Sequence, residues 1–152
     1  MADTTVHILG SGTCFPARGE MRRAHPGFYV KWGQDPDQHL LLECSQGIAE
    51  RLEDVGIAPD DIRHLAVSHA HPDHFALPQF LQSAYCRTIL RGERPKGEEE
   101  RTLDLYVPRC IASNIQALLD MHFEERATTN PTGGSSGLPS PVLRVLRMTM
   151  IP

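Results

Sequence analysis

Two kinds of apolar pattern alternate along this chain, and together they restrict the folds that it can adopt. Short runs of β-branched, aromatic and leucine residues predict strands, whereas apolar residues three or four positions apart predict helices. Two or three strands come first, and helix, strand, helix, strand and helix follow. This order predicts an α/β fold. The expected strands are residues 6–9, 27–32, 39–44, 62–68 and 103–107.

Three helical stripes account for most of the remaining apolar residues. The first has Ile48, Leu52 and Val55, with Ser45 as its predicted N-cap and Gly56 as its predicted stop. Turn residues between 27–32 and 39–44 predict that these two strands form a hairpin. The other two stripes consist of Leu77, Phe80, Leu81 and Ala84, and of Ile111, Ile115, Leu118 and Leu119.

Composition excludes several classes of protein. A length of 152 residues favours one domain, and a net charge of −4 gives no overall positive field for nucleic acid. No apolar run is long enough to cross a membrane, and residues 6–9 are too short for a signal-peptide core. We therefore expect a cytoplasmic protein. The four cysteines are far apart and form no CxxC pair, so we predict buried thiols rather than disulfides.

The chemistry of the chain is concentrated in His69-x-His71-x-Asp73-His74. In an extended segment, residues two apart project to the same side, so His69 and His71 can meet one metal ion. Pro72 keeps His71 extended, and Asp73 and His74 can then reach a second ion. Imidazole and carboxylate ligands suit zinc, iron and manganese. The segment follows a predicted strand, where α/β proteins commonly bind ligands.

Four motifs, in order, resemble the metallo-β-lactamase-fold hydrolases, and most closely the branch that contains ribonuclease Z. They are LGSGTCFP at 9–16, LLLECSQG at 40–47, SHAHPDH at 68–74 and YVP at 106–108. Together they extend over about residues 6–122. The HxHxDH motif is highly specific for this superfamily, and the other three are weak individually.

The resemblance implies a metal site and a reaction. His69 and His71 would bind the first of two divalent ions, and Asp73 and His74 the second, with zinc expected and manganese or iron as alternatives. The reaction would be hydrolysis by metal-activated water, with Asp73 as the catalytic residue that steers the water or accepts its proton. An acidic residue of the third-strand motif supports the metal centre in such relatives. Here it is Glu43 rather than aspartate, so either this role or a solvated carboxylate is expected.

The resemblance also implies an incomplete fold. Relatives place further histidine and aspartate ligands in a second half, whereas this chain has only His122 after the motif, which we expect on a helix rather than at the metal. We predict an N-terminal half of an αββα sandwich over residues 1–126, apparently truncated. A Gly/Ser/Pro/Thr linker or loop follows at 127–141. A strand is expected within 142–152, as the start of a missing half.

The expected function is therefore a metal-dependent hydrolase of phosphodiester bonds, similar to ribonuclease Z, with a small-molecule or nucleic-acid substrate. One alternative is a degenerate half-domain without turnover, acting in metal binding or interaction. Another is the same fold hydrolysing thioesters, lactones or β-lactams, since fold does not fix function. A half of a sandwich would expose an apolar face, so a homodimer or a missing C-terminal half is the expected partner. No membrane partner is expected.

Overall fold

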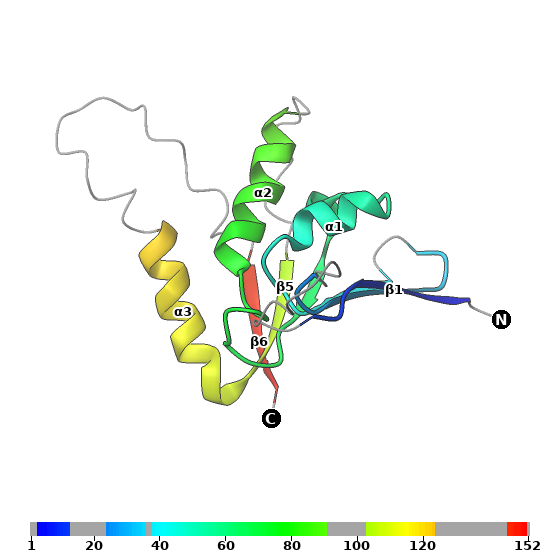
Figure 1. Ribbon diagram of the computed structural model, residues 1–152. Helices are drawn as coiled ribbons and strands as arrows, with labels where there is room; N and C mark the ends of the chain where they lie inside the picture. Colours follow the sequence, from blue (N-terminus) through cyan, green and yellow to red (C-terminus); the bar gives the residue numbers. More distant parts are fainter. Residues whose placement is uncertain (1–2, 13–23, 36–37, 91–102, 124–145, 152) are drawn as a thin grey trace.

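A six-stranded sheet organises the part of the chain that the structure describes. A computed structural model describes residues 3–12, 24–35, 38–90, 103–123 and 146–151 (Figure 1). The strands lie in their order along the chain, β1-β2-β3-β4-β5-β6. The pairs β1–β2 and β2–β3 are antiparallel, and the pairs from β3 to β6 are parallel. Their bounds are Thr4–Gly10, Gly27–Trp32, His39–Leu42, His64–Ala66, Leu103–Pro108 and Leu146–Ile151.

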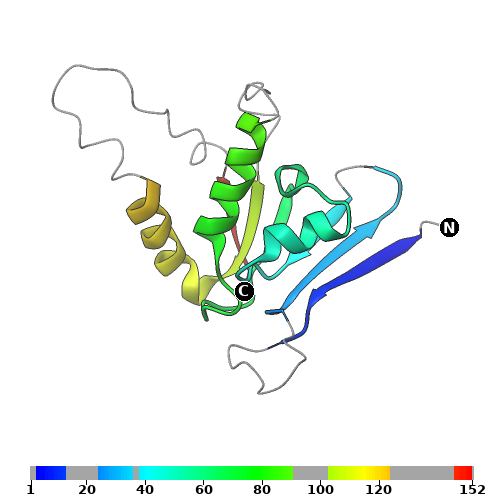
Figure 2. The same cartoon turned by 45° about the horizontal axis from the view of Figure 1, so that its top comes forward.

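Helices connect the parallel strands. Helix α1 (Ile48–Asp54) and a 3-10 turn (Pro59–Asp61) join β3 to β4, α2 (Leu77–Leu90) follows β4, and α3 (Arg109–Phe123) follows β5. Crossover connections between parallel strands are almost always right-handed. Because each strand lies beside the next in the chain, all of these connections run in the same direction across the sheet. Crossovers of one hand then place the helices on one face, as Figures 1 and 2 show.

The core lies between this helical layer and the sheet. Leu41, Leu65 and Leu105 are aligned across β3, β4 and β5, and none of the three is exposed to solvent. Ile115 and Leu119 of α3 are also fully buried. Burial alternates along β5, as predicted from its sequence, because successive side chains point to opposite faces of a strand.

The opposite face of the sheet is apolar near β1 and β2. Val6 pairs with Val30 and Ile8 pairs with Phe28, so these four side chains share one face. Val6 and Ile8 are 55% and 69% exposed. Trp32, which pairs with Thr4 on the same face, is 39% exposed. Among the described residues, this face of the sheet has no covering layer, which agrees with the fold class predicted from sequence.

Several local predictions need correction. Ser45 is not the N-cap of α1: that position is Gly47, with a φ of 78°, which glycine adopts without strain. Strands β3 and β4 end before residues 44 and 68, because the chain leaves the sheet to form the loops beyond them. Cys44 is buried as predicted, but Cys86 and Cys110 are exposed. Gly56 does follow α1 with a positive φ.

The predicted linker at 127–141 lies outside the described residues. Strand β6 occupies residues 146–151, inside the segment where a strand was expected, and the division into domains stays a prediction. Among the described residues, no helix has both the length and the hydropathy of a membrane span.

Candidate metal centre

The HxHxDH segment lies in the loop between β4 and α2, at the carboxyl ends of the parallel strands. Two backbone hydrogen bonds fold the loop on itself, because the carbonyl of His71 accepts from the amides of His74 and Phe75, both at 2.9 Å. Pro72 lies inside this turn. The turn reverses the chain, so that His74 returns toward His69 instead of continuing away from it.

A second segment holds this loop in place from the side of β3. The amide of Glu43 donates to the carbonyl of Ala66 at 2.8 Å, and the amide of Cys44 donates to the carbonyl of His74 at 3.0 Å. The amide of Ala76 also donates to the carbonyl of Cys44. The residues after β3 are therefore bonded to both ends of the histidine loop, which places Glu43 beside His74.

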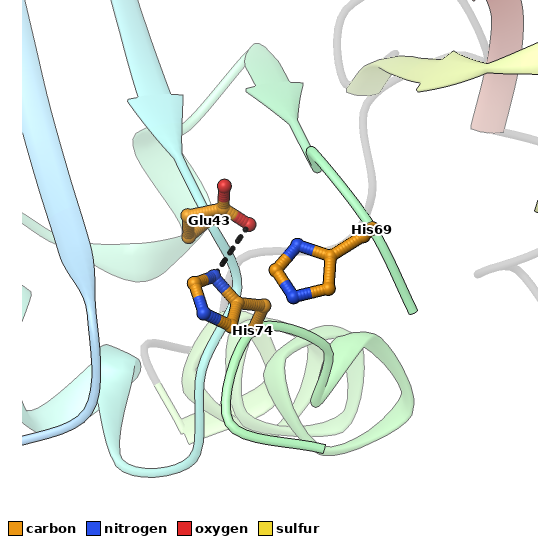
Figure 3. Close-up of side chains that lie close together, drawn as sticks. All are labelled: Glu43, His69 and His74. Atoms are coloured by element: carbon orange, nitrogen blue, oxygen red, sulfur yellow. Dashed lines mark ion pairs between the residues drawn. The ribbon is translucent and has the colours of Figure 1, made fainter. Parts of the chain in front are cut away.

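Glu43, His69 and His74 form a cluster of three donors. One nitrogen or oxygen atom from each lies within 4.8 Å of the other two. Figure 3 shows the imidazole ring of His69 beside that of His74, with the Glu43 carboxylate next to the ring of His74. The ring centroids of His69 and His74 are 4.1 Å apart. Oε2 of Glu43 lies 3.3 Å from Nδ1 of His74.

The other two residues of the motif lie next to this cluster. The ring of His71 meets that of His69 edge-on at a centroid distance of 4.6 Å and is exposed. Asp73 is 8% exposed, and its Oδ2 lies 3.6 Å from Nε2 of His74. All four motif residues thus share one neighbourhood. Their division between a first and a second ion stays a prediction.

The sequence left two roles open for Glu43, support of the metal centre or a solvated carboxylate, and the structure separates them. Its side chain is 14% exposed and contacts both His74 and the amide of Ser68, so it is not a carboxylate that faces open water. Its φ is 65°, a left-handed value that costs a non-glycine residue about 1–3 kcal/mol and is often found at functional sites. The backbone bonds of Glu43 and Cys44 keep Glu43 in this conformation.

The residues present fit a divalent cation. Nδ1 of His74 is buried and has no hydrogen-bond partner among the described residues, although a carboxylate oxygen lies 3.3 Å away. A carboxylate beside Nδ1 favours the tautomer with hydrogen on Nδ1, which leaves the lone pair of Nε2 of His74 for a cation. The donors are also of the kinds that zinc, manganese and iron bind.

Other candidate groups contribute little to this site. Burial raises the pKa of the Cys44 thiol well above its ordinary value, so the thiol remains protonated and is a poor nucleophile. Helix α3 includes His122, whose side chain is outside the described part of the structure. The sequence singled out Glu43. It included Ser68 in the SHAHPDH motif without predicting a role for its side chain, which contacts His69, or for its amide, which contacts Glu43.

The fold and the sequence both have known relatives. A protein named ribonuclease Z from Nocardia farcinica is 29% identical over 151 residues, which cover 93% of this chain and 42% of that protein. The metallo-β-lactamase-fold protein YhfI from Bacillus subtilis superposes with a TM-score of 0.58 at 20% identity, over 98% of this chain and 47% of YhfI. This chain has the metallo-β-lactamase fold and is similar in sequence to proteins named ribonuclease Z. No protein-family model matches it.

A third protein of similar fold is named for a different reaction from that of ribonuclease Z. A diphosphatase of the PhnP family superposes with a TM-score of 0.55 at 17% identity, over the whole of this chain and 52% of the diphosphatase. The ribonuclease Z-like chain thus spans about half the length of these relatives, or less. At such identities the structural likeness establishes the fold, and it leaves the reaction open.

Proposed function

We propose that the ribonuclease Z-like chain is a metal-dependent hydrolase that cleaves phosphodiester bonds. The observation that supports this most is the convergence of Glu43, His69 and His74 within 4.8 Å, at the carboxyl edge of the sheet. His71 and Asp73 complete the proposed set. Two divalent ions are proposed, with zinc first and manganese or iron as alternatives.

Each residue has a separate task in this proposal. His69, His71, Asp73 and His74 hold the ions, and Glu43 fixes the ring of His74 through the 3.3 Å contact to Nδ1. When bound, divalent ions supply a Lewis acid that acidifies water and stabilises negative charge on phosphoryl oxygens. Asp73 is buried beside Nε2 of His74, where its carboxylate can steer the attacking water or accept a proton from it.

The substrate class follows from the relatives and is part of the proposal. A ribonuclease and a diphosphatase both act on bonds to phosphorus, which favours a phosphodiester or diphosphate over a thioester, lactone or β-lactam. Nucleic acid and a small-molecule phosphodiester are both retained as substrates. A cytoplasmic location remains a prediction from the sequence.

A second candidate function is supported by the open face of the sheet. Val6 and Ile8 are more than half exposed, as expected for a surface that a partner covers. The alternative is therefore a half-domain without turnover, which binds metal or a partner. A second copy of this chain or a separate C-terminal half would cover the face.

Hydrolysis assays distinguish these two functions. The 152-residue chain would be incubated with a nitrophenyl phosphodiester and with a precursor tRNA, with and without added zinc or manganese. The hydrolase proposal predicts metal-dependent cleavage that His69→Ala abolishes and His7→Ala on β1 preserves. Metal binding without cleavage of either substrate would favour the half-domain, and cleavage that survives His69→Ala would contradict the proposed site.

A further inference from the structure

Ser68 lies at the edge of the proposed metal centre and contacts two of its residues. Its hydroxyl oxygen is 2.8 Å from Nδ1 of His69, and its amide donates to Oε2 of Glu43 at 3.3 Å. The chain bends at Ser68, immediately after Val67 leaves the sheet. This bend turns the hydroxyl back toward the ring of the next residue, whereas neighbouring side chains in a straight strand point to opposite sides.

We propose that Ser68 is a positioning residue that fixes the tautomer and orientation of His69. The proposal rests on the proposed function, because it assumes that His69 presents one ring nitrogen to a metal. In a neutral imidazole one nitrogen carries hydrogen and the other carries a lone pair, and the hydrogen bond at one nitrogen sets the state of the other. Ser68 occupies Nδ1, so Nε2 is the nitrogen left for the ion.

The direction of this hydrogen bond follows from the need for a free lone pair. A serine hydroxyl can either donate or accept, so geometry alone permits both tautomers. A metal-binding nitrogen must be unprotonated, and Nε2 of His69 must therefore lack hydrogen. Nδ1 then carries the hydrogen and donates it to the hydroxyl oxygen of Ser68. The ring of His69 is held against the ring of His74, at 4.1 Å between centroids.

Glu43 and Ser68 together orient both histidines of the cluster. The same carboxylate oxygen of Glu43 contacts Nδ1 of His74 and the amide of Ser68, each at 3.3 Å. The hydroxyl of Ser68 then contacts Nδ1 of His69. The polar atoms thus connect one imidazole to the other through Glu43 and Ser68. Groups that orient ligating histidines in this way typically change metal affinity about 10–100-fold when they are removed.

The first test examines the tautomer without metal. Nitrogen-15 NMR of the metal-free chain, at a pH where His69 is neutral, should show hydrogen on Nδ1 of His69. Free histidine in water favours hydrogen on Nε2, so this signature is distinctive. In Ser68→Ala the population should shift toward the Nε2–H form, and Ser68→Thr, which keeps the hydroxyl, should restore the wild-type signal. An Nε2–H form in the wild type, or no change in Ser68→Ala, overturns the proposal.

The second test measures affinity for zinc by calorimetry on the same proteins. Ser68→Ala should bind zinc about 10–100-fold more weakly, and Ser68→Thr should bind as the wild type does. Ser113→Ala, the same change on the exposed face of α3, is the matched control and should not alter affinity. Equal affinity in Ser68→Ala and the wild type overturns the role of Ser68. A wild type that binds no zinc contradicts the proposed function instead, while the NMR result still decides the tautomer.

Discussion

Oε2 of Glu43 lies 3.3 Å from Nδ1 of His74, although helix α1 and strand β4 separate the two residues along the chain. Glu43 follows β3 and His74 precedes α2. The amide of Cys44 donates to the carbonyl of His74, and the amide of Ala76 donates to the carbonyl of Cys44, which brings the two segments together. The proposed metal centre therefore depends on packing between two loops, as well as on the histidine motif itself.

Replacing the charge of Glu43 should weaken metal binding. Glu43→Gln keeps the size of the side chain and an acceptor for the Ser68 amide, but it removes the negative charge next to His74. We expect affinity for zinc to fall about tenfold, at the lower end of the effect typical for groups that orient a ligand. Calorimetric titration measures this, with Glu50→Gln on the exposed side of α1 as control. Unchanged affinity in Glu43→Gln would exclude an electrostatic role for Glu43.

Removing the side chain of Glu43 should relieve backbone strain. Glycine adopts a φ of 65° freely, so Glu43→Gly should increase the free energy of unfolding of the metal-free chain by about 0.5–1 kcal/mol. In the same variant zinc affinity should fall. Urea denaturation measures the stability. Glu50→Gly, inside α1, should instead reduce stability by about 1 kcal/mol. A loss of stability in Glu43→Gly would show that its contacts outweigh the strain.

Gly10 and Gly56 should differ sharply in their tolerance of alanine. A Cβ atom on Gly10 would collide with the backbone carbonyl of His25, which cannot move as a side chain can. We expect Gly10→Ala to cost about 2 kcal/mol or more. Gly56 has a φ of 80° and open space around it, so Gly56→Ala should cost only about 1 kcal/mol from its conformation. Thermal unfolding of both variants measures the difference, and equal losses would argue against the close approach at Gly10.

The buried thiol of Cys44 should make the protein less stable at alkaline pH. Burial raises its pKa above the unfolded value of 9.0, so this contribution to stability is complete below pH 9.0. Above that pH the unfolded chain ionises while the folded chain does not, and the free energy of unfolding falls by up to about 1.4 kcal/mol per pH unit. Urea denaturation at several pH values should show a shallower decline in Cys44→Ala. The same slope in both proteins would contradict a protonated buried thiol.

The sequence predicted the framework of the fold because its apolar periodicity is regular. Alternation at Leu103, Leu105 and Val107 and the helical spacing of Ile115 and Leu119 identify their elements and their buried sides. The HxHxDH motif predicted a metal site in the loop where His69 and His74 now lie close together. The exposure of Trp32 could not be predicted from sequence, because it depends on a sheet face that the described residues leave uncovered.

Some features of the site could not be predicted from the sequence, because they depend on contacts between residues that are distant along the chain. The left-handed backbone of Glu43 is imposed by bonds to Ala66 and to the segment after His74. Ser68 is an ordinary loop residue until the bend of the chain turns its hydroxyl toward His69. Gly47 replaces Ser45 as the N-cap because the path from β3 into α1 needs a positive φ. None of these three features leaves a periodic pattern in the sequence from which it could be predicted.

The central claim is that His69 and His74 hold a divalent cation. Titration of the 152-residue chain with zinc and with manganese, followed by calorimetry, tests it most directly. We predict that the wild type and His7→Ala bind the ion with equal affinity, while His69→Ala and His74→Ala each lose binding. Binding that is unchanged in both of these variants, or no binding in the wild type, would contradict the claim.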